Sequence, residues 1–192
     1  DALEAAGIPA FGPRANAAVI EASKVFSKNL MARYHIPTAK YQTFTDMDAA
    51  LAYVRAEGAP IVVKADGLAL GKGVVVAQTA AEAEEAVRSM MADKKFGEAG
   101  TRLVIEECMT GPEVTVLAFC DGEHVVPMPS SQDHKRAFDG NRGPNTGGMG
   151  AISPSPNYTP ELAARCMDEI FLPTLAALKA EGRPFRGVLY FG

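Results

Sequence analysis

The sequence predicts an α+β fold, and three kinds of pattern indicate it. Thr-x-x-Asp and Thr-x-x-Glu signals precede stretches whose apolar residues repeat with helical spacing. Short apolar runs of strand length lie between those stretches. The pair Asp121-Gly122, between two such runs, is a strong signal for a β-hairpin. We therefore expect helices and sheets together, with at least one hairpin.

The N-terminal stretch is expected to be mainly helical. Residues 1–13 look like the end of a helix followed by a short strand from Ile8 to Phe11, and we interpret them as the last unit of a preceding α/β domain. Residues 16–34 are helical in character, with Lys24 and Lys28 four positions apart on one face. This spacing places two cations side by side.

Two capping boxes define the next helices. Thr45-x-x-Asp48 predicts a helix that stops at Gly58. Thr79-x-x-Glu82 predicts a second helix. The residues of that helix expected to face the core are Ala83, Val87 and Met90.

Strands are expected between and after these helices. The strand candidates are Ile61–Lys64, Gly73–Ala77, Leu103–Glu106, Glu113–Phe119, His124–Met128 and Gly187–Gly192. Residues 127–156 hold 5 of the 18 glycines and 5 of the 13 prolines, which predicts a long irregular loop. A last helix is expected from Thr159-Pro160 to about Ala180, and Pro173 must break or kink it.

Composition excludes several classes of protein. The 192 residues carry 19 Lys+Arg against 23 Asp+Glu, a net charge of −4, which argues against a general binder of nucleic acid or anionic membranes. The longest apolar runs fall far short of the roughly 20 residues that a membrane helix needs. The sequence therefore predicts a soluble, globular chain.

Cysteine usage and the chain ends add two expectations. Cys108, Cys120 and Cys166 are odd in number and well separated, so they support neither a disulfide framework nor a CxxC metal site, and a reducing cytoplasm fits best. The chain starts at Asp1 rather than Met and stops within a strand candidate, so we expect a fragment of something longer.

The glycine-rich segment 61–77 predicts a phosphate site. An apolar strand ends at Lys64, and Gly67, Gly71, Lys72 and Gly73 follow, which offers ammonium groups and accessible backbone N–H groups to an anion. The spacing differs from a Walker A loop, and a strand rather than a helix follows. A glycine-rich hairpin with two solvated lysines is the alternative.

Segment 103–116 offers carboxylates after a buried strand. Because side chains alternate along a strand, Glu106 and Glu107 are expected to point in opposite directions. The connection to Glu113 can present backbone groups to an adenine, with Glu113 accepting from ribose hydroxyls. A charged strand end with rim carboxylates is the alternative reading.

Segment 130–156 combines charge with exposed backbone. Asp133, His134, Lys135 and Arg136 occur in succession, and the run Asn145-Thr146-Gly147-Gly148 supplies hydroxyl, amide and backbone donors suited to a phosphate or carboxylate. A histidine beside Lys and Arg tends to stay neutral, so binding is favoured over proton transfer for His134. A basic surface turn followed by a flexible loop is the alternative.

Taken in order, these segments resemble the glycinamide ribonucleotide synthetases, or phosphoribosylamine–glycine ligases, of the ATP-grasp superfamily. The resemblance covers essentially the whole chain, and SQDHKR with GPNTGGMGA is its most specific part. It also runs through Gly12-Pro13, Ser23-Lys24-x-Phe26-x-Lys28, Ile36-Pro37-Thr38, residues 61–77 and Ile105-Glu106-Glu107. It implies an ATP-grasp fold, with two α+β subdomains around an ATP cleft.

The resemblance implies a role for each matching position. Lys24, Lys64 and Lys72 would contact the nucleotide phosphates, with Gly67, Gly71 and Gly73 in the loop that closes over them. The adenine would be framed by Glu106, Glu107 and Met109, and the ribose held by Glu113. The segments 133–136 and 145–150 would lie toward glycine and 5-phosphoribosylamine. Lys64, Lys72 and residues 133–136 are the candidates for catalysis.

The implied reaction is a two-step ligation through glycyl phosphate, in which positioning and charge neutralisation by lysines, backbone donors and Mg²⁺ dominate. The family binds Mg²⁺ through a Glu-x-Asn pair, and no such pair occurs in residues 1–192, so the metal ligands are expected beyond them. Pro112 stands where the family usually has an acidic residue. We expect the chain by itself to bind ATP weakly and not to ligate glycine.

The resemblance also implies a domain plan. Residues 1–22 would end an N-terminal domain, 23–56 form the helical start of the ATP-grasp region, 57–128 a small β-rich subdomain and 129–192 the start of a larger one. The remaining domains of the parent chain would be its partners. Alternatives are another ATP-grasp ligase or carboxylase, a non-catalytic nucleotide-binding module, and an α/β module without a ligand.

Overall fold

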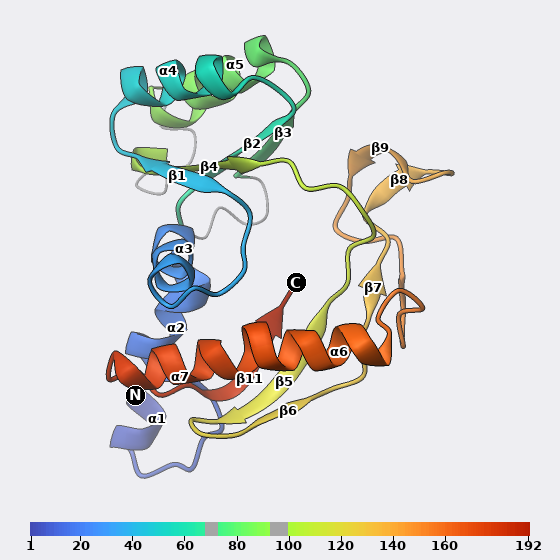
Figure 1. Cartoon of the computed structure of the whole chain (residues 1–192). Coiled ribbons are helices and arrows are strands. Elements are labelled where there is room, and N and C mark those ends of the chain that lie inside the picture. The colour runs from blue at the N-terminus through green and yellow to red at the C-terminus, as the bar shows by residue number, and fades with distance from the viewer. Residues whose placement is uncertain (68–72, 93–99) are drawn as a thin grey trace. The chain divides into compact units, whose positions relative to one another are not determined.

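The computed structural model describes residues 1–67, 73–92 and 100–192, and the chain forms two compact units (Figure 1). The terminal unit combines Asp1–Ala18 with Gly111–Gly192, and the central unit is Val19–Thr110. The predicted boundaries after residues 22, 56 and 128 do not coincide with these limits. That domain plan concerns functional segments, and it stays a prediction.

The central unit is a four-stranded antiparallel sheet with helices, in the strand order β1-β4-β2-β3. Its strands are β1 (Tyr41–Phe44), β2 (Ile61–Ala65), β3 (Val74–Ala77) and β4 (Leu103–Glu107). Its helices are α2 (Ala15–Ala22, which begins in the terminal unit), α3 (Lys24–Arg33), α4 (Met47–Glu57) and α5 (Ala80–Met91). The predicted strands are confirmed, and β1 is an addition.

Alternation along the strands separates an apolar face from a charged one. Val63 and Ile105, both fully buried, lie in one hydrophobic core with residues of α4 and α5. Lys64 and Glu106 are the next residues along their strands, so they point to the opposite face. Figure 1 shows α4 and α5 on one side of the sheet and α3 on the other. The charged face is therefore the one toward α3.

The helix starts match the predictions in part. α5 begins as predicted, since Thr79 Oγ1 accepts from the Glu82 N–H at 3.2 Å. The predicted cap of α4 is wrong by one residue, because Asp46 and not Thr45 accepts from the Ala49 N–H, at 2.8 Å. The predicted helical stretch 16–34 is interrupted at Ser23, which caps α3. A helix does end at Gly58, whose φ of 79° suits glycine.

A surface ion pair between α4 and α5 predicts a specific pH dependence. Arg55 binds Glu84 through two hydrogen bonds of 2.9 and 2.7 Å, and this contact, with a smaller contribution from Arg88, lowers the pKa of Glu84 from 4.5 to about 2. A lowered carboxyl pKa adds stability above the usual pKa, and that stability disappears as the pH falls through the folded-state value. The Arg55→Met variant is therefore expected to be less stable than wild type above about pH 5.

Denaturant unfolding of both proteins across the acid range measures this effect. The difference between their free energies of unfolding should shrink as the pH falls from 4.5 toward about 2. The matched control is Arg142→Met, an exposed arginine on another unit, which should show no such loss. A difference between wild type and Arg55→Met that is constant over this range would contradict the prediction.

The terminal unit contains three small sheets and a long C-terminal helical segment. Its strands are β5 (Val116–Asp121), β6 (Val125–Pro127), β7 (Gln132–Asp133), β8 (Arg136–Phe138), β9 (Arg142–Asn145), β10 (Ala151–Ile152) and β11 (Arg186–Phe191). Its helical elements are α1 (Ala2–Ala5), α6 (Pro160–Cys166), the π-helical turn η2 (Met167–Phe171) and α7 (Leu172–Ala180). The largest sheet has the order β11-β5-β6 and is antiparallel.

One prediction for this unit is confirmed, and another is confirmed in part. The hairpin turn contains Gly122 with a φ of 97°, as the Asp-Gly pair predicted. The C-terminal helical segment begins at the cap Thr159 as predicted, but Pro173 does not break it: the segment stays continuous and contains the π-helical turn η2 just before Pro173. Phe171 of η2 lies against Phe191 of β11, with ring centroids 4.1 Å apart.

Two other predictions are wrong. Ile8–Phe11 is not a strand: Ile8 donates its N–H to Leu3 at 2.9 Å, and Pro9 has no N–H to give to a sheet. Residues 127–156 are not one irregular loop, because β7 pairs with β10 and β8 with β9. Strands of two to four residues are too short to show apolar periodicity.

None of the helices in the described part of the chain is long and apolar enough to span a membrane.

Candidate functional site

A buried carboxylate shared by two lysines is the centre of the candidate site. Glu106 of β4 forms ion pairs with Lys64 of β2 and with Lys28 of α3, whose Nζ lies 2.7 Å from Glu106 Oε2. The Glu106 side chain is only 6% exposed and that of Lys28 13%. The Lys28 contact is an ion pair rather than a well-angled hydrogen bond, so Oε2 keeps unused accepting capacity.

Besides Glu106, two contacts hold Lys28 on this face of the sheet. Its ammonium group donates to Thr38 Oγ1 at 2.7 Å and lies 5.4 Å from the centre of the Tyr41 ring. Burial acts to raise the pKa of Glu106, but the contacts from Lys28 and Lys64 outweigh it, and the pKa is lowered. Glu106 is thus an anion that is charged at neutral pH.

Lys24 completes the set of cations. Its Nζ donates to the carbonyl oxygen of Gly67 at 2.8 Å, at the start of the glycine-rich segment. Burial lowers the pKa of Lys24, and the carboxylate of Asp66 acts in the opposite direction. Gly67 has a φ of 89°, a conformation that favours glycine. Gly73 lies at the other end of the segment and accepts from the Ala65 N–H at 2.8 Å.

The cations of this cluster share few carboxylates. Asp66 forms an ion pair with Arg102 at 2.6 Å, and Glu106 forms ion pairs with both Lys28 and Lys64. The described cluster therefore has an excess of positive charge, held in partly desolvated positions where attraction to an anion is strong. A polyphosphate is an anion of that kind.

The neighbouring carboxylate has a different environment. Glu107 is exposed, and its Oε1 accepts from the Lys40 N–H at 2.9 Å, so it supports the start of β1. The prediction that Glu106 and Glu107 point in opposite directions is thus confirmed. Met109 follows as a 71% exposed side chain. The predicted roles of Glu107 and Met109 toward an adenine stay predictions.

A second cluster lies in the terminal unit around Lys135. Its Nζ is 2.5 Å from Glu113 Oε1 and 3.6 Å from Asp133 Oδ2. Burial acts to lower the pKa of Lys135, but the hydrogen bond to Glu113 outweighs it and the pKa is raised. The structure therefore brings together Glu113 and the 133–136 segment, which are far apart in the sequence.

The glycine-rich run 145–150 folds back onto the same segment. Thr146 donates its N–H and its hydroxyl to the Lys135 carbonyl, at 2.7 and 2.9 Å, and Gly148 N–H donates to Thr146 Oγ1 at 3.1 Å. His134 N–H donates to Gly150 O at 2.9 Å. Arg136 donates to Gly143 O at 2.7 Å. Gly147 and Gly148 are exposed, although the Gly148 N–H is already used by Thr146.

Comparison with known proteins places the chain in a family. Residues 22–192 match the family described as phosphoribosylglycinamide synthetase, ATP-grasp (A) domain. The chain belongs to this family. It is 57% identical over its whole length to a phosphoribosylamine–glycine ligase of Vibrio vulnificus (strain YJ016), and it spans 45% of the length of that relative.

Solved structures agree with this family. The crystal structure of phosphoribosylamine–glycine ligase from Thermotoga maritima matches with a TM-score of 0.85 and 36% identity, over 95% of this chain and 46% of that one. A biotin carboxylase complex from Campylobacter jejuni matches with a TM-score of 0.76 over 99% of this chain and 41% of that one. At 18% identity it shows the fold alone. The predicted ATP-grasp fold is confirmed.

Several residues of the central cluster were missed by the sequence-based prediction. Lys28, Asp66 and Arg102 lie in the central cluster but were not among the predicted site residues. The position of Lys28 on the same helical face as Lys24 could have indicated that Lys28 belongs to the site. That position did not indicate that Lys28 pairs with Glu106. Gly71 and Lys72, which were predicted to bind phosphate, lie outside the described residues.

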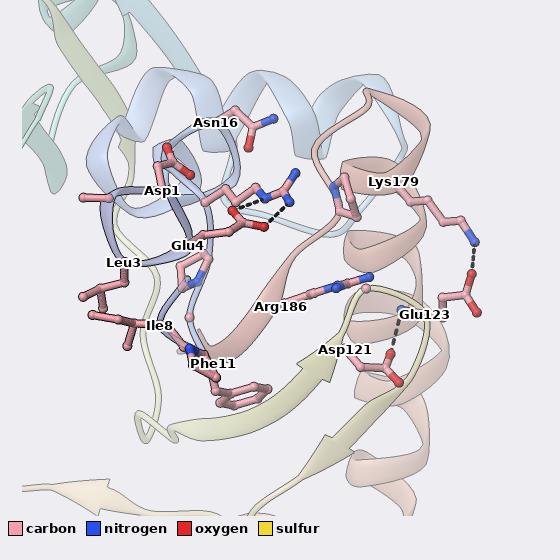
Figure 2. Close-up of a pocket in the computed structure, with 18 of the residues that line it drawn as sticks. Asp1, Leu3, Glu4, Ile8, Phe11, Asn16, Asp121, Glu123, Lys179 and Arg186 are labelled. Carbon is pink, nitrogen blue, oxygen red and sulfur yellow. Dashed lines mark hydrogen bonds and ion pairs between the residues drawn. The ribbon is translucent and has the colours of Figure 1, made fainter. Parts of the chain in front are cut away.

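A pocket elsewhere in the terminal unit contains none of the predicted site residues. Figure 2 shows it between the N-terminal segment, the turn after β5 and the residues around Lys179. Four of its charged side chains form two ion pairs: Arg14 with Glu4 at 2.5 Å, and Lys179 with Glu123 at 2.6 Å. We assign no ligand to this pocket.

Proposed function

We propose that the protein containing this chain is a phosphoribosylamine–glycine ligase. It would join the carboxylate of glycine to the amine of 5-phosphoribosylamine, with conversion of ATP to ADP and phosphate. The family membership and the 57% identity to a ligase of that name support the reaction. The observation that carries ATP use is the cluster of Lys24, Lys28 and Lys64 around Glu106, whose excess positive charge suits a polyphosphate.

The proposed nucleotide roles rest on this cluster for the phosphates and on the family resemblance for the adenine and the ribose. Lys24 and Lys64 would bind the phosphates, with Gly67 and Gly73 at the two ends of the loop that covers them. The backbone of residues 106–109 would frame the adenine, and Glu113 would accept from the ribose hydroxyls. The tether between Glu113 and Lys135 supports this last role, because it fixes the carboxylate without using both of its oxygens.

The chemistry that we propose has two steps. A carboxylate oxygen of glycine attacks the γ-phosphorus, the bond to ADP breaks, and glycyl phosphate forms. The amine of phosphoribosylamine then attacks the glycyl carbonyl, phosphate leaves, and the amine loses a proton. Both steps bring anions together, so charge neutralisation and positioning supply most of the rate. Residues 133–136 and 145–148, including Asp133, His134, Lys135, Arg136 and Asn145, would do this for the glycine and phosphoribosylamine groups.

Mg²⁺ is expected in such a reaction, and the proposal names no ligands for it among the described residues. No group of three or more His, Cys, Asp or Glu side chains in the described ranges is placed to hold a metal ion. We therefore assign no metal-dependent step to this chain.

We propose a cytoplasmic location, since Cys108, Cys120 and Cys166 are free thiols and suit a reducing compartment.

Release of phosphate from ATP tests the proposal, measured in the protein that contains this chain. Release should require both glycine and phosphoribosylamine, and glycinamide ribonucleotide should be detected by mass spectrometry. Phosphate release that is driven by D-alanine or bicarbonate in place of glycine would indicate another ATP-grasp ligase or carboxylase. ATP binding without any amino-acid-dependent turnover would indicate a nucleotide-binding module.

A further inference from the structure

A buried aspartate beside the lysine cluster has no part in the proposed chemistry. Asp66 lies two residues after Lys64, where β2 has ended and the glycine-rich segment begins. It is only 4% exposed, although it carries a charge. A buried charge is costly unless it is paired and hydrogen-bonded, so the contacts of Asp66 show what it supports.

The carboxylate of Asp66 is used by two other segments of the central unit. Its oxygens accept from Ser23 Oγ at 3.1 and 3.2 Å and from the Val25 N–H at 3.1 Å, at the start of α3. An oxygen also binds Arg102 at 2.6 Å, and Asp66 N–H donates to the Arg102 carbonyl at 2.9 Å. A carboxylate at a helix N-terminus is further favoured by the helix dipole.

These segments are the ones that carry the cations and their carboxylate. Helix α3 bears Lys24 and Lys28, β2 bears Lys64, and Arg102 directly precedes β4, which bears Glu106. Asp66 is thus a point at which all three segments are tied together by hydrogen bonds. A shift of α3 along the sheet would change the spacing between its lysines and Lys64.

We propose that Asp66 is a positioning residue, which holds Lys24 and Lys28 of α3 at the correct distance from Lys64 for a nucleotide polyphosphate. This inference rests on the proposed function for the identity of that ligand. Asp66 itself need not touch the ligand, because both of its oxygens already bind protein groups. The adjacent contact from Lys24 Nζ to Gly67 O depends directly on this alignment.

Asp66→Asn tests the role with a minimal change of shape. The amide replaces one oxygen by an NH₂ group, which cannot accept from Arg102 and removes the charge. Asp46→Asn is the matched control. Asp46 also accepts from a helix N-terminal N–H, that of Ala49 at 2.8 Å, but α4 carries no predicted site residue. Ser23→Ala is a milder variant that removes the contacts of the hydroxyl with both Asp66 oxygens and its cap on the Phe26 N–H, while keeping the charge of Asp66.

Two measurements on the protein that contains this chain decide the matter. The first is the dissociation constant of a non-hydrolysable ATP analogue. It should rise about tenfold or more in Asp66→Asn, because small displacements of binding groups are costly. It should stay unchanged in Asp46→Asn. The KM for ATP should rise in parallel, while the KM for glycine should not. Ser23→Ala should give a smaller change in the same direction, which keeps the test valid if Asp66→Asn unfolds.

The second measurement needs no nucleotide. Acylation of lysines by a small reagent, read by mass spectrometry, should modify Lys24 severalfold faster in Asp66→Asn than in wild type, because Lys24 would lose its place against Gly67. Unchanged Lys24 modification, or analogue binding equal to wild type, overturns the inference. A wild-type protein that binds no ATP analogue overturns the proposed function instead, and Lys24 modification then decides the positioning role alone.

Discussion

Replacing Lys64 with alanine is expected to abolish measurable ATP binding. The variant loses a phosphate-binding cation and also leaves Glu106 with Lys28 as its remaining partner in the described cluster. The negative charge of Glu106, which has then lost one of its two counter-charges, repels the phosphates of ATP. Charged hydrogen bonds contribute roughly 1.5–3 kcal/mol each, so with the added repulsion the affinity should fall by about a hundredfold or more.

Isothermal titration calorimetry with ATP, on the wild type and the variant, measures this change. Lys40→Ala is the matched control, because Lys40 is an exposed lysine of the same unit that pairs with Glu57 at 2.8 Å. The control should bind ATP like the wild type. ATP binding by Lys64→Ala within a few fold of wild type would show that the central cluster is not the phosphate site.

The elements of the central unit were largely predictable because their signals are local. The capping box at Thr79, the β-forming run that ends at Lys64 and the helix stop at Gly58 each depend on a few neighbouring residues. The cap of α4 was misplaced by one residue because Thr45 and Asp46 are both good capping residues. Only the geometry of the chain decides between two adjacent candidates.

The candidate site was predictable as a set of segments and not as a network. Sequence patterns pointed to Lys64 and Glu106, and the family resemblance pointed to Lys24, but a sequence does not state which cation meets which carboxylate. The pairing of Lys28 with Glu106, across 78 positions of sequence, depends on how α3 lies against the sheet. In the terminal unit, the pairing of Lys135 with Glu113 likewise depends on strands too short to be recognised.

Loss of Glu106 is expected to cause the largest loss of stability in the central unit. Its 6% exposed carboxylate is shared by Lys28 and Lys64, so Glu106→Gln leaves two close cations without a counter-charge. Removing one partner of a buried ion pair costs about 3–5 kcal/mol. Because contacts with the lysines lower the pKa of Glu106, its stabilisation is present above its usual pKa of 4.5 and is lost as the pH falls through the lower folded-state value.

Amide hydrogen exchange in β2 and β4 measures this stability for the central unit alone. Glu107→Gln is the control: its side chain is exposed and keeps an oxygen for Lys40, so its stability should stay within about 0.5 kcal/mol of wild type. Adding Lys28→Met to Glu106→Gln should recover part of the loss, because it removes one of the two unpaired cations. If Glu106→Gln is as stable as wild type, or the second substitution destabilises it further, charge sharing at Glu106 does not hold α3 to the sheet.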